Sequence, residues 1–133
     1  MVNDVLEFEA EHAFGIEVRP KAWERPRFNK NGTVYETKAF KEYKQKIVEA
    51  AKLDMCGRPP YDVPVKVWLD FHKKSNVVSR TFGDIDNLTK AVLDAFNGIV
   101  YTDDRLIVEL HVAKHYDAEE NIIWVGINPV DEE

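Results

Sequence analysis

The chain has 133 residues, of which 44% are hydrophobic and 32% charged, with a net charge of −6, and these values are typical of one ordinary globular domain. No apolar run approaches the roughly 20 residues that a membrane-spanning helix needs, and the acidic N-terminus lacks the basic start of a signal peptide. With Cys56 as its one cysteine, the chain can form neither an internal disulfide nor a thiolate zinc cluster, so we expect a cytoplasmic protein without a membrane partner.

The first predicted strand, residues 12–18, leads into a strongly basic segment. Residues 19–46 hold nine Lys/Arg and three Asp/Glu, so a local charge of +6 stands inside an acidic chain. The loop at its start, residues 19–37, contains two prolines and an Asn-Gly turn signal. Loops of this length are usually functional or disordered. Because binding of a polyanion depends on the local field, a nucleic-acid partner remains open.

A helix and a strand are predicted next. Thr37 is a suitable N-cap for a helix from residue 38 to about Met55. Its apolar residues recur at helical spacing on one face: Phe40, Tyr43, Ile47, Ala50 and Ala51. Residues 65–72 then alternate between apolar and polar side chains, which is typical of a half-buried strand.

The rest of the chain completes an α+β pattern. A second helix is predicted from about Asp86 to Asn97, ended by Gly98. Residues 106–115 and 122–128 are predicted strands, and the turn between them suggests an antiparallel hairpin. The order strand, helix, strand, helix, strand, strand predicts a single α+β domain in which two helices flank a mixed sheet.

Carboxylates gather around the second predicted helix. In "FGDIDNLTKAVLDAFNGIVYTDD", Asp84 and Asp86 stand at the start of the helix, and Asp103 and Asp104 follow its end. Mg²⁺ prefers oxygen ligands, keeps several waters, and is usually held by a few carboxylates together with substrate phosphate. The pattern therefore predicts a hard-cation site, in which Lys90 can neutralise charge on a phosphoryl group.

A structural alternative explains part of this pattern. Asp86 can serve as the helix N-cap with Asp84 in the preceding loop, and Lys90 with Asp94 can form a surface ion pair. An N-cap needs one carboxylate, however, and nothing in this alternative requires a second pair at 103–104. An EF-hand is excluded, since its positions 5, 6 and 12 would hold Leu88, Thr89 and Ala95. A nucleotide-sugar D-x-D site usually needs a larger domain than this chain provides.

At these residues the chain resembles the RusA-type Holliday-junction resolvases of bacteria and prophages. The elements D-x-D-N-x-x-K, D-A-x-N-G and Y-x-D-D stand in family order and spacing within "DIDNLTKAVLDAFNGIVYTDD". A weaker resemblance extends over "RPKAWERPRF…GTVYETKAFKEYK". It covers most of the chain after about residue 12, so residues 1–133 are predicted to form one nuclease domain of this type, with residues 1–11 as an acidic N-terminal extension.

The resemblance implies an activity and its residues. It implies a homodimer that makes paired nicks on opposite strands of a four-way DNA junction in recombination and repair, with Mg²⁺ as cofactor and Mn²⁺ as a substitute. The implied site consists of the metal ligands Asp84, Asp86 and Asp104, the essential Lys90, and the supporting Asn87 and Asp103. Two alternatives remain: a nuclease acting on other branched DNA, such as flaps or forks, and a DNA-binding module without catalysis.

The basic loop offers a surface for DNA phosphates. Its cations are interleaved with Trp23, Phe28 and Tyr35, and aromatic rings can stack on exposed bases. The alternative is a solvated loop with its aromatics folded back onto the core. The predicted DNA-binding residues are Lys21, Arg25, Arg27 and Lys30, extended by Lys73, Lys74 and Arg80 upstream of the aspartates.

Two further features are assigned structural roles. His111 and His115 share a face of the predicted strand, but the sequence suggests no third ligand nearby for a zinc ion. Cys56 lies beside Gly57 at the end of the first helix. Neither feature is predicted to be part of a site.

Overall fold

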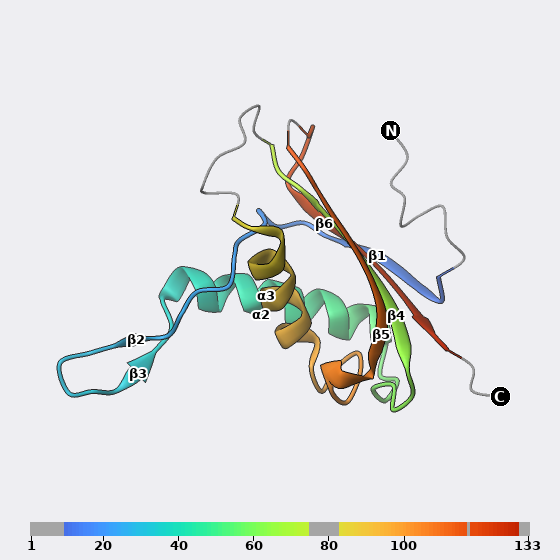
Figure 1. Cartoon of the computed structure of the whole chain (residues 1–133), viewed down its shortest axis with the longest axis horizontal. Coiled ribbons are helices and arrows are strands. Elements are labelled where there is room, and N and C mark those ends of the chain that lie inside the picture. Colours follow the sequence, from blue (N-terminus) through green and yellow to red (C-terminus); the bar gives the residue numbers. More distant parts are fainter. Residues whose placement is uncertain (1–9, 75–82, 117, 131–133) are drawn as a thin grey trace.

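A four-stranded sheet with two helices on one face forms the body of the protein (Figure 1). The computed structural model describes residues 10–74, 83–116 and 118–130. The sheet order is β1-β6-β4-β5, from β1 (His12–Ile16), β4 (Val65–His72), β5 (Ile107–His115) and β6 (Ile122–Pro129). The helices are α2 (Lys38–Met55) and α3 (Ile85–Phe96), and a separate hairpin pairs β2 (Arg27–Phe28) with β3 (Val34–Tyr35). The predicted α+β class and mixed sheet are confirmed.

The pairing of the last two strands differs from the prediction. β4 lies between β5 and β6, pairing parallel with β5 and antiparallel with β6, so the predicted β5–β6 hairpin is wrong. The turn between the two strands does reverse the chain, but α3 has already carried β5 across to pair in parallel with β4. A local turn signal indicates a reversal and does not specify which strand lies next in the sheet.

Helix α2 begins and ends as its sequence predicts. Thr37 is the N-cap, and its Oγ1 accepts a hydrogen bond of 3.2 Å from the backbone N–H of Phe40. Cys56 ends the helix in the left-handed conformation, with φ of 53°. The predicted apolar face is buried at Phe40, Tyr43, Ile47 and Ala51, where it packs on the sheet.

Strand β4 is buried on both faces, which corrects the prediction of a half-buried strand. Its apolar row belongs to the core between sheet and helices: Val65, Val67, Leu69 and Phe71. The other row, directed away from the helices, contains Trp68, Asp70 and His72, and each of these is at most 9% exposed. Polar side chains buried on a sheet face need partners there, so this row is more than a solvated surface.

Helix α3 starts one residue earlier than predicted. Asp84 rather than Asp86 occupies the N-cap position, and its side chain makes no capping hydrogen bond. After Phe96 the chain turns through Gly98, whose φ of +79° favours glycine. No helix in the described part of the chain is long and apolar enough to cross a membrane.

Candidate nuclease site

A pocket between α3 and β5 brings together most of the residues predicted for the metal site. Its volume is about 440 Å³. From α3 it is lined by Ile85, Asp86, Thr89, Lys90, Leu93 and Asp94, and the opposite wall is formed by Asp104, Leu110 and Val112. Asp86 and Lys90, one turn apart on α3, therefore share one cavity with Asp104, which follows the helix in the sequence.

Two members of the apolar row of β5, Leu110 and Val112, form a wall of this pocket. The alternation of apolar residues along β5 predicted a strand, which is confirmed. Val108 and Leu110, however, are 61% and 41% exposed. Leu110 and Val112 face the pocket instead, so they give the carboxylates a partly apolar surrounding.

The predicted metal ligands are spread over two elements. Asp84 and Asp86 are exposed at the start of α3, and Asp86 Oδ1 accepts a hydrogen bond of 3.0 Å from the backbone N–H of Asn87. Asp104 begins the short 3-10 helix η1 (Asp104–Leu106). Asp84 is not among the residues that line the pocket, and within the described ranges these three carboxylates do not form a closely gathered ligand group.

The two adjacent aspartates have different surroundings. Asp103 is the N-cap of η1, accepts a 3.4 Å hydrogen bond from the backbone N–H of Arg105, and lies 3.4 Å from Arg105 Nε. Asp104 lines the pocket. The side chain of Asp103 thus stabilises the turn, whereas that of Asp104 forms part of the pocket wall.

Negative charge accumulates around the buried Tyr101. Burial raises the pKa of Tyr101, and the nearby carboxylates of Asp104, Asp94 and Asp103 raise this pKa further. The Tyr101 hydroxyl donates a 2.8 Å hydrogen bond to the backbone carbonyl of Leu93, which fixes the ring beneath α3.

The side chains of Asp86 and Asp104 fit Mg²⁺, because they offer carboxylate oxygens and the cavity has room for the waters that the ion retains.

Lys90 lies between a carboxylate and an aromatic ring. Its Nζ is 3.5 Å from Asp94 Oδ2 and 5.1 Å from the centre of the Trp23 ring. The backbone N–H of Trp23 donates a 2.9 Å hydrogen bond to the carbonyl of Asn87. The predicted Lys90–Asp94 pair is therefore present, and Trp23 joins the basic segment to the first turn of α3.

Close backbone packing holds the same two segments together. Gly83 has φ of +92°, and a Cβ at this position would lie 2.7 Å from the Cβ of Ala22. The Gly83 carbonyl accepts a 2.8 Å hydrogen bond from Lys114 Nζ. The backbone just before Asp84 is thereby fixed from two sides, by the basic segment and by β5.

The basic segment forms a hairpin that projects from the body (Figure 1). Arg25, Arg27 and Lys30 are exposed, and Asn29 Oδ1 accepts hydrogen bonds from the backbone N–H groups of residues 31 and 33 in the turn. Phe28 and Tyr35 are 69% and 43% exposed. These two rings are not folded back onto the core, whereas Trp23 packs against it.

The other predicted DNA-binding residues have varied positions. Lys21 Nζ lies 3.4 Å from Glu24 Oε2, and Lys74 is exposed. Lys73 is only 1% exposed, and burial followed by the positive charge of Arg19 lowers its pKa. A side chain so deeply buried offers DNA almost no surface. Arg80 lies outside the described residues.

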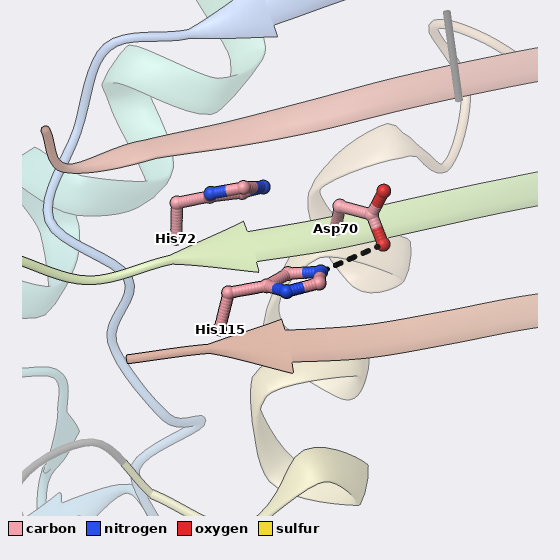
Figure 2. A group of neighbouring side chains, drawn as sticks. All are labelled: Asp70, His72 and His115. Atoms are coloured by element: carbon pink, nitrogen blue, oxygen red, sulfur yellow. Dashed lines mark ion pairs between the residues drawn. The ribbon is translucent and has the colours of Figure 1, made fainter. Parts of the chain in front are cut away.

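A second cluster of potential ligands was missed by the sequence analysis. Asp70, His72 and His115 lie together on the sheet face away from the helices (Figure 2). Burial lowers the pKa of His72, and the neighbouring His115 lowers it further. His111 is not part of this group and instead stacks on Trp68, with ring centres 5.5 Å apart. The alternation of residues along β4 and the spacing of the two histidines in β5 can be seen in the sequence. The register that pairs β4 with β5, and so brings these side chains together, cannot be seen there.

The chain is similar to a known protein family and to a bacterial protein. The family model described as "Endodeoxyribonuclease RusA" matches residues 17–128. The chain is also similar to "Uncharacterized protein YqaN" of Bacillus subtilis (strain 168), with 29% identity over 128 residues, covering 82% of this chain and 90% of the relative. The matched region contains both the basic hairpin and the pocket.

Proposed function

The chain belongs to the RusA endodeoxyribonuclease family, and from this premise we propose that it is a Mg²⁺-dependent enzyme that resolves four-way DNA junctions in recombination and repair. The observation that carries the proposal is the shared pocket of Asp86, Lys90 and Asp104. Two carboxylates and an ammonium group in one cavity are the groups needed to bind a cation and a phosphodiester together. The reaction adds water across one P–O bond of the backbone and leaves a phosphate monoester and a hydroxyl group.

In this proposal the carboxylates of Asp84, Asp86 and Asp104 hold the cation, which is Mg²⁺ or, in its place, Mn²⁺. When bound, such an ion activates water and stabilises charge on phosphate oxygens. Asp103 keeps the turn that presents Asp104, as its contacts with Arg105 support. Asn87 anchors the basic segment through its carbonyl.

Lys90 is the residue we assign to the scissile phosphate. Its Nζ stands 3.5 Å from Asp94 and over the Trp23 ring, at the wall of the pocket. Both contacts direct an otherwise flexible side chain. A fixed positive charge beside the phosphate stabilises the negative charge that develops in the transition state.

The hairpin supplies the DNA interface in this proposal. Arg25, Arg27 and Lys30 contact backbone phosphates, and Phe28 stacks on bases exposed at the branch point. Cutting two opposing strands of a two-fold symmetric junction needs two active sites, so we propose that the enzyme acts as a homodimer. Because the proposed substrate is DNA, we propose that the enzyme acts in the cytoplasm.

The test is cleavage of labelled four-way, forked and linear duplex DNA, compared side by side with Mg²⁺ and with EDTA. We expect symmetric nicks in the four-way junction with Mg²⁺, no cleavage with EDTA, and little cleavage of linear duplex. Asp86→Asn should abolish cleavage and leave junction binding intact or tighter, because a negative charge facing phosphate is removed. The matched control is Glu49→Gln, which neutralises an exposed carboxylate on α2 outside the pocket.

These cleavage measurements distinguish a junction-resolving nuclease from a nuclease for branched DNA in general and from a DNA-binding module without catalysis. Equal cleavage of forked and four-way DNA would broaden the substrate to branched DNA in general. Binding of the junction without Mg²⁺-dependent cleavage would contradict the proposed catalysis. Full activity of Asp86→Asn would overturn the assignment of the pocket.

A further inference from the structure

The cluster of Asp70, His72 and His115 has the composition of a metal site. One potential ligand atom from each residue lies within 4.8 Å of the other two. Asp70 and His72 are buried, and the side chain of His115 is 32% exposed, so the group opens to solvent on one side. This cluster is separate from the carboxylates of α3, because it lies on the sheet face that the helices do not cover (Figure 2).

Strand geometry explains why these three side chains meet. Asp70 and His72 are two residues apart on β4, so they project from the same face. His115 is the direct register partner of His72 on β5, and the two imidazole rings stack with centres 4.5 Å apart. His115 Nε2 lies 3.5 Å from Asp70 Oδ1, which is the contact marked in Figure 2.

The backbone at this end of the sheet is firmly hydrogen-bonded. The N–H of Lys73 donates to the carbonyl of His115 at 2.9 Å, and the N–H of Lys74 donates to Asn121 Oδ1 at 2.7 Å. These bonds tie β4 to β5 and to the start of β6 directly beside the cluster. Ligands held on rigid strands lose less freedom when an ion binds than ligands on a loop.

We propose that Asp70, His72 and His115 bind a transition-metal dication of the zinc type. Two imidazole nitrogens and one carboxylate oxygen, with a fourth position open to water, form a common zinc ligand set. Mg²⁺ prefers oxygen ligands throughout, so this site selects against the ion proposed for the nuclease pocket.

The distances are compatible with such an ion. Tetrahedral coordination at 2.0–2.1 Å places two ligand atoms about 3.4 Å apart. The separation of 3.5 Å between His115 and Asp70 already matches this spacing. The remaining separations are no greater than 4.8 Å, so these ligand atoms must come closer together when an ion binds.

An ion at this position links β4 and β5, and through β5 it affects the nuclease pocket. It bridges β4 and β5 at their carboxyl ends. The neighbouring Lys114, on the opposite face of β5, holds the carbonyl of Gly83 at 2.8 Å. The ion therefore stabilises the strand end that fixes the backbone before Asp84, and this role does not depend on the proposed nuclease activity.

The test is titration of metal-stripped full-length protein with Co²⁺ and Zn²⁺ in excess Mg²⁺, so that the carboxylates of the pocket are already occupied. We expect one equivalent of Co²⁺ with the visible absorption of a four-coordinate site, and displacement of Co²⁺ by Zn²⁺. At a hundredfold excess of Zn²⁺ over its Kd, the Tm should rise by about 5–10 °C. Mg²⁺ alone should produce neither effect.

Variants assign the binding to these ligands. His115→Asn and His72→Gln should each weaken Co²⁺ binding at least about 100-fold, in line with the loss of one of three ligands. The matched control is His111→Asn, which removes the neighbouring histidine on the same face of β5 and should bind Co²⁺ like the unmodified chain. Far-UV circular dichroism without metal establishes that each variant is folded.

Two results would overturn the proposal. One is the absence of stoichiometric Co²⁺ or Zn²⁺ binding by the unmodified chain. The other is unchanged affinity in folded His115→Asn or His72→Gln. Loss of binding in both His111→Asn and His115→Asn, with unchanged binding in His72→Gln, would show that the histidine pair of β5, rather than the three-residue cluster, holds the ion.

Discussion

At the scale of single residues, substitution of Lys90 tests whether this side chain is a catalytic group or only one half of a surface ion pair. If Lys90 only pairs with Asp94, Lys90→Ala costs a few tenths of a kcal/mol of stability and no activity. If it faces the scissile phosphate, cleavage of bound junction should fall roughly 10²–10³-fold. Single-turnover cleavage at saturating enzyme measures this chemical step apart from binding. We expect Lys90→Ala to be nearly inactive.

Two further variants control for the position of this charge. Lys90→Arg keeps the charge but changes its shape and reach, so we expect impaired cleavage. Trp23→Leu removes the ring beside Lys90 and should lower the cleavage rate less than Lys90→Ala does. An alanine variant that cleaves at the normal rate would leave Lys90 with the surface role alone.

The adjacent pair Asp103 and Asp104 gives a second prediction. Asp104 lines the pocket, whereas Asp103 caps η1 and pairs with Arg105. Asp104→Asn should therefore abolish Mg²⁺-dependent cleavage. Asp103→Asn should retain much of the activity and lose little stability, because asparagine caps a helix about as well as aspartate does. Parallel cleavage rates and thermal unfolding check both parts, and the reverse order of activities would exchange the two roles.

At the scale of secondary-structure elements, the β2–β3 hairpin carries the third prediction. Replacement of Arg25, Arg27 and Lys30 by alanine should weaken junction binding and leave folding intact, because all three are exposed. The slope of log affinity against log salt is about −0.9 per neutralised phosphate, so it should become shallower by roughly one for each lost contact. Binding titrations at several salt concentrations measure this slope.

A charge-matched variant serves as the control for the hairpin. Lys52, Arg58 and Lys66 lie outside the hairpin, and their replacement by alanine removes the same total charge. We expect this variant to keep a slope close to that of the unmodified chain. Equal changes in both variants would indicate a response to net charge rather than contacts through the hairpin.

At this scale, elements with local sequence signals could be predicted, and contacts between distant residues could not. Helix α2 was predicted with its cap because Thr37, the apolar spacing and the terminal Cys56-Gly57 are all local signals. The pairing of β5 with β4 was not predicted, since strand neighbours depend on contacts between distant residues. Asp86, Lys90 and Asp104 were singled out by their motif, and their shared pocket follows from this fold. His72 and His115 became neighbours only through the unpredicted β4–β5 register.

At the scale of the whole molecule, the paired cleavage that we propose predicts a homodimer with one active site in each chain. Sedimentation of the protein bound to a four-way junction should give two chains of 15.4 kDa for each DNA molecule. In heterodimers of an unmodified chain and Asp86→Asn, only one strand should be cut. We therefore expect nicked junctions to accumulate instead of resolved duplexes.

The nicked-circle assay on a supercoiled cruciform checks this expectation, because one cut relaxes the plasmid and two coordinated cuts linearise it. Homodimers of the unmodified chain should give mainly linear product, and mixed dimers mainly nicked circles. Linear product from mixed dimers at the full rate would show that a single active site cuts both strands.

The order of strands also affects how the protein is made. β6, the last strand of the chain, lies between β1 and β4, so that His12 faces Ile127. While the ribosome is still translating, β1 has no partner and β4 has one open edge. Such edges are prone to aggregation, and pairing between distant strands is slow. The nascent chain therefore exposes these strand edges until β6 emerges, and the sheet can be completed only after β6 has been synthesised.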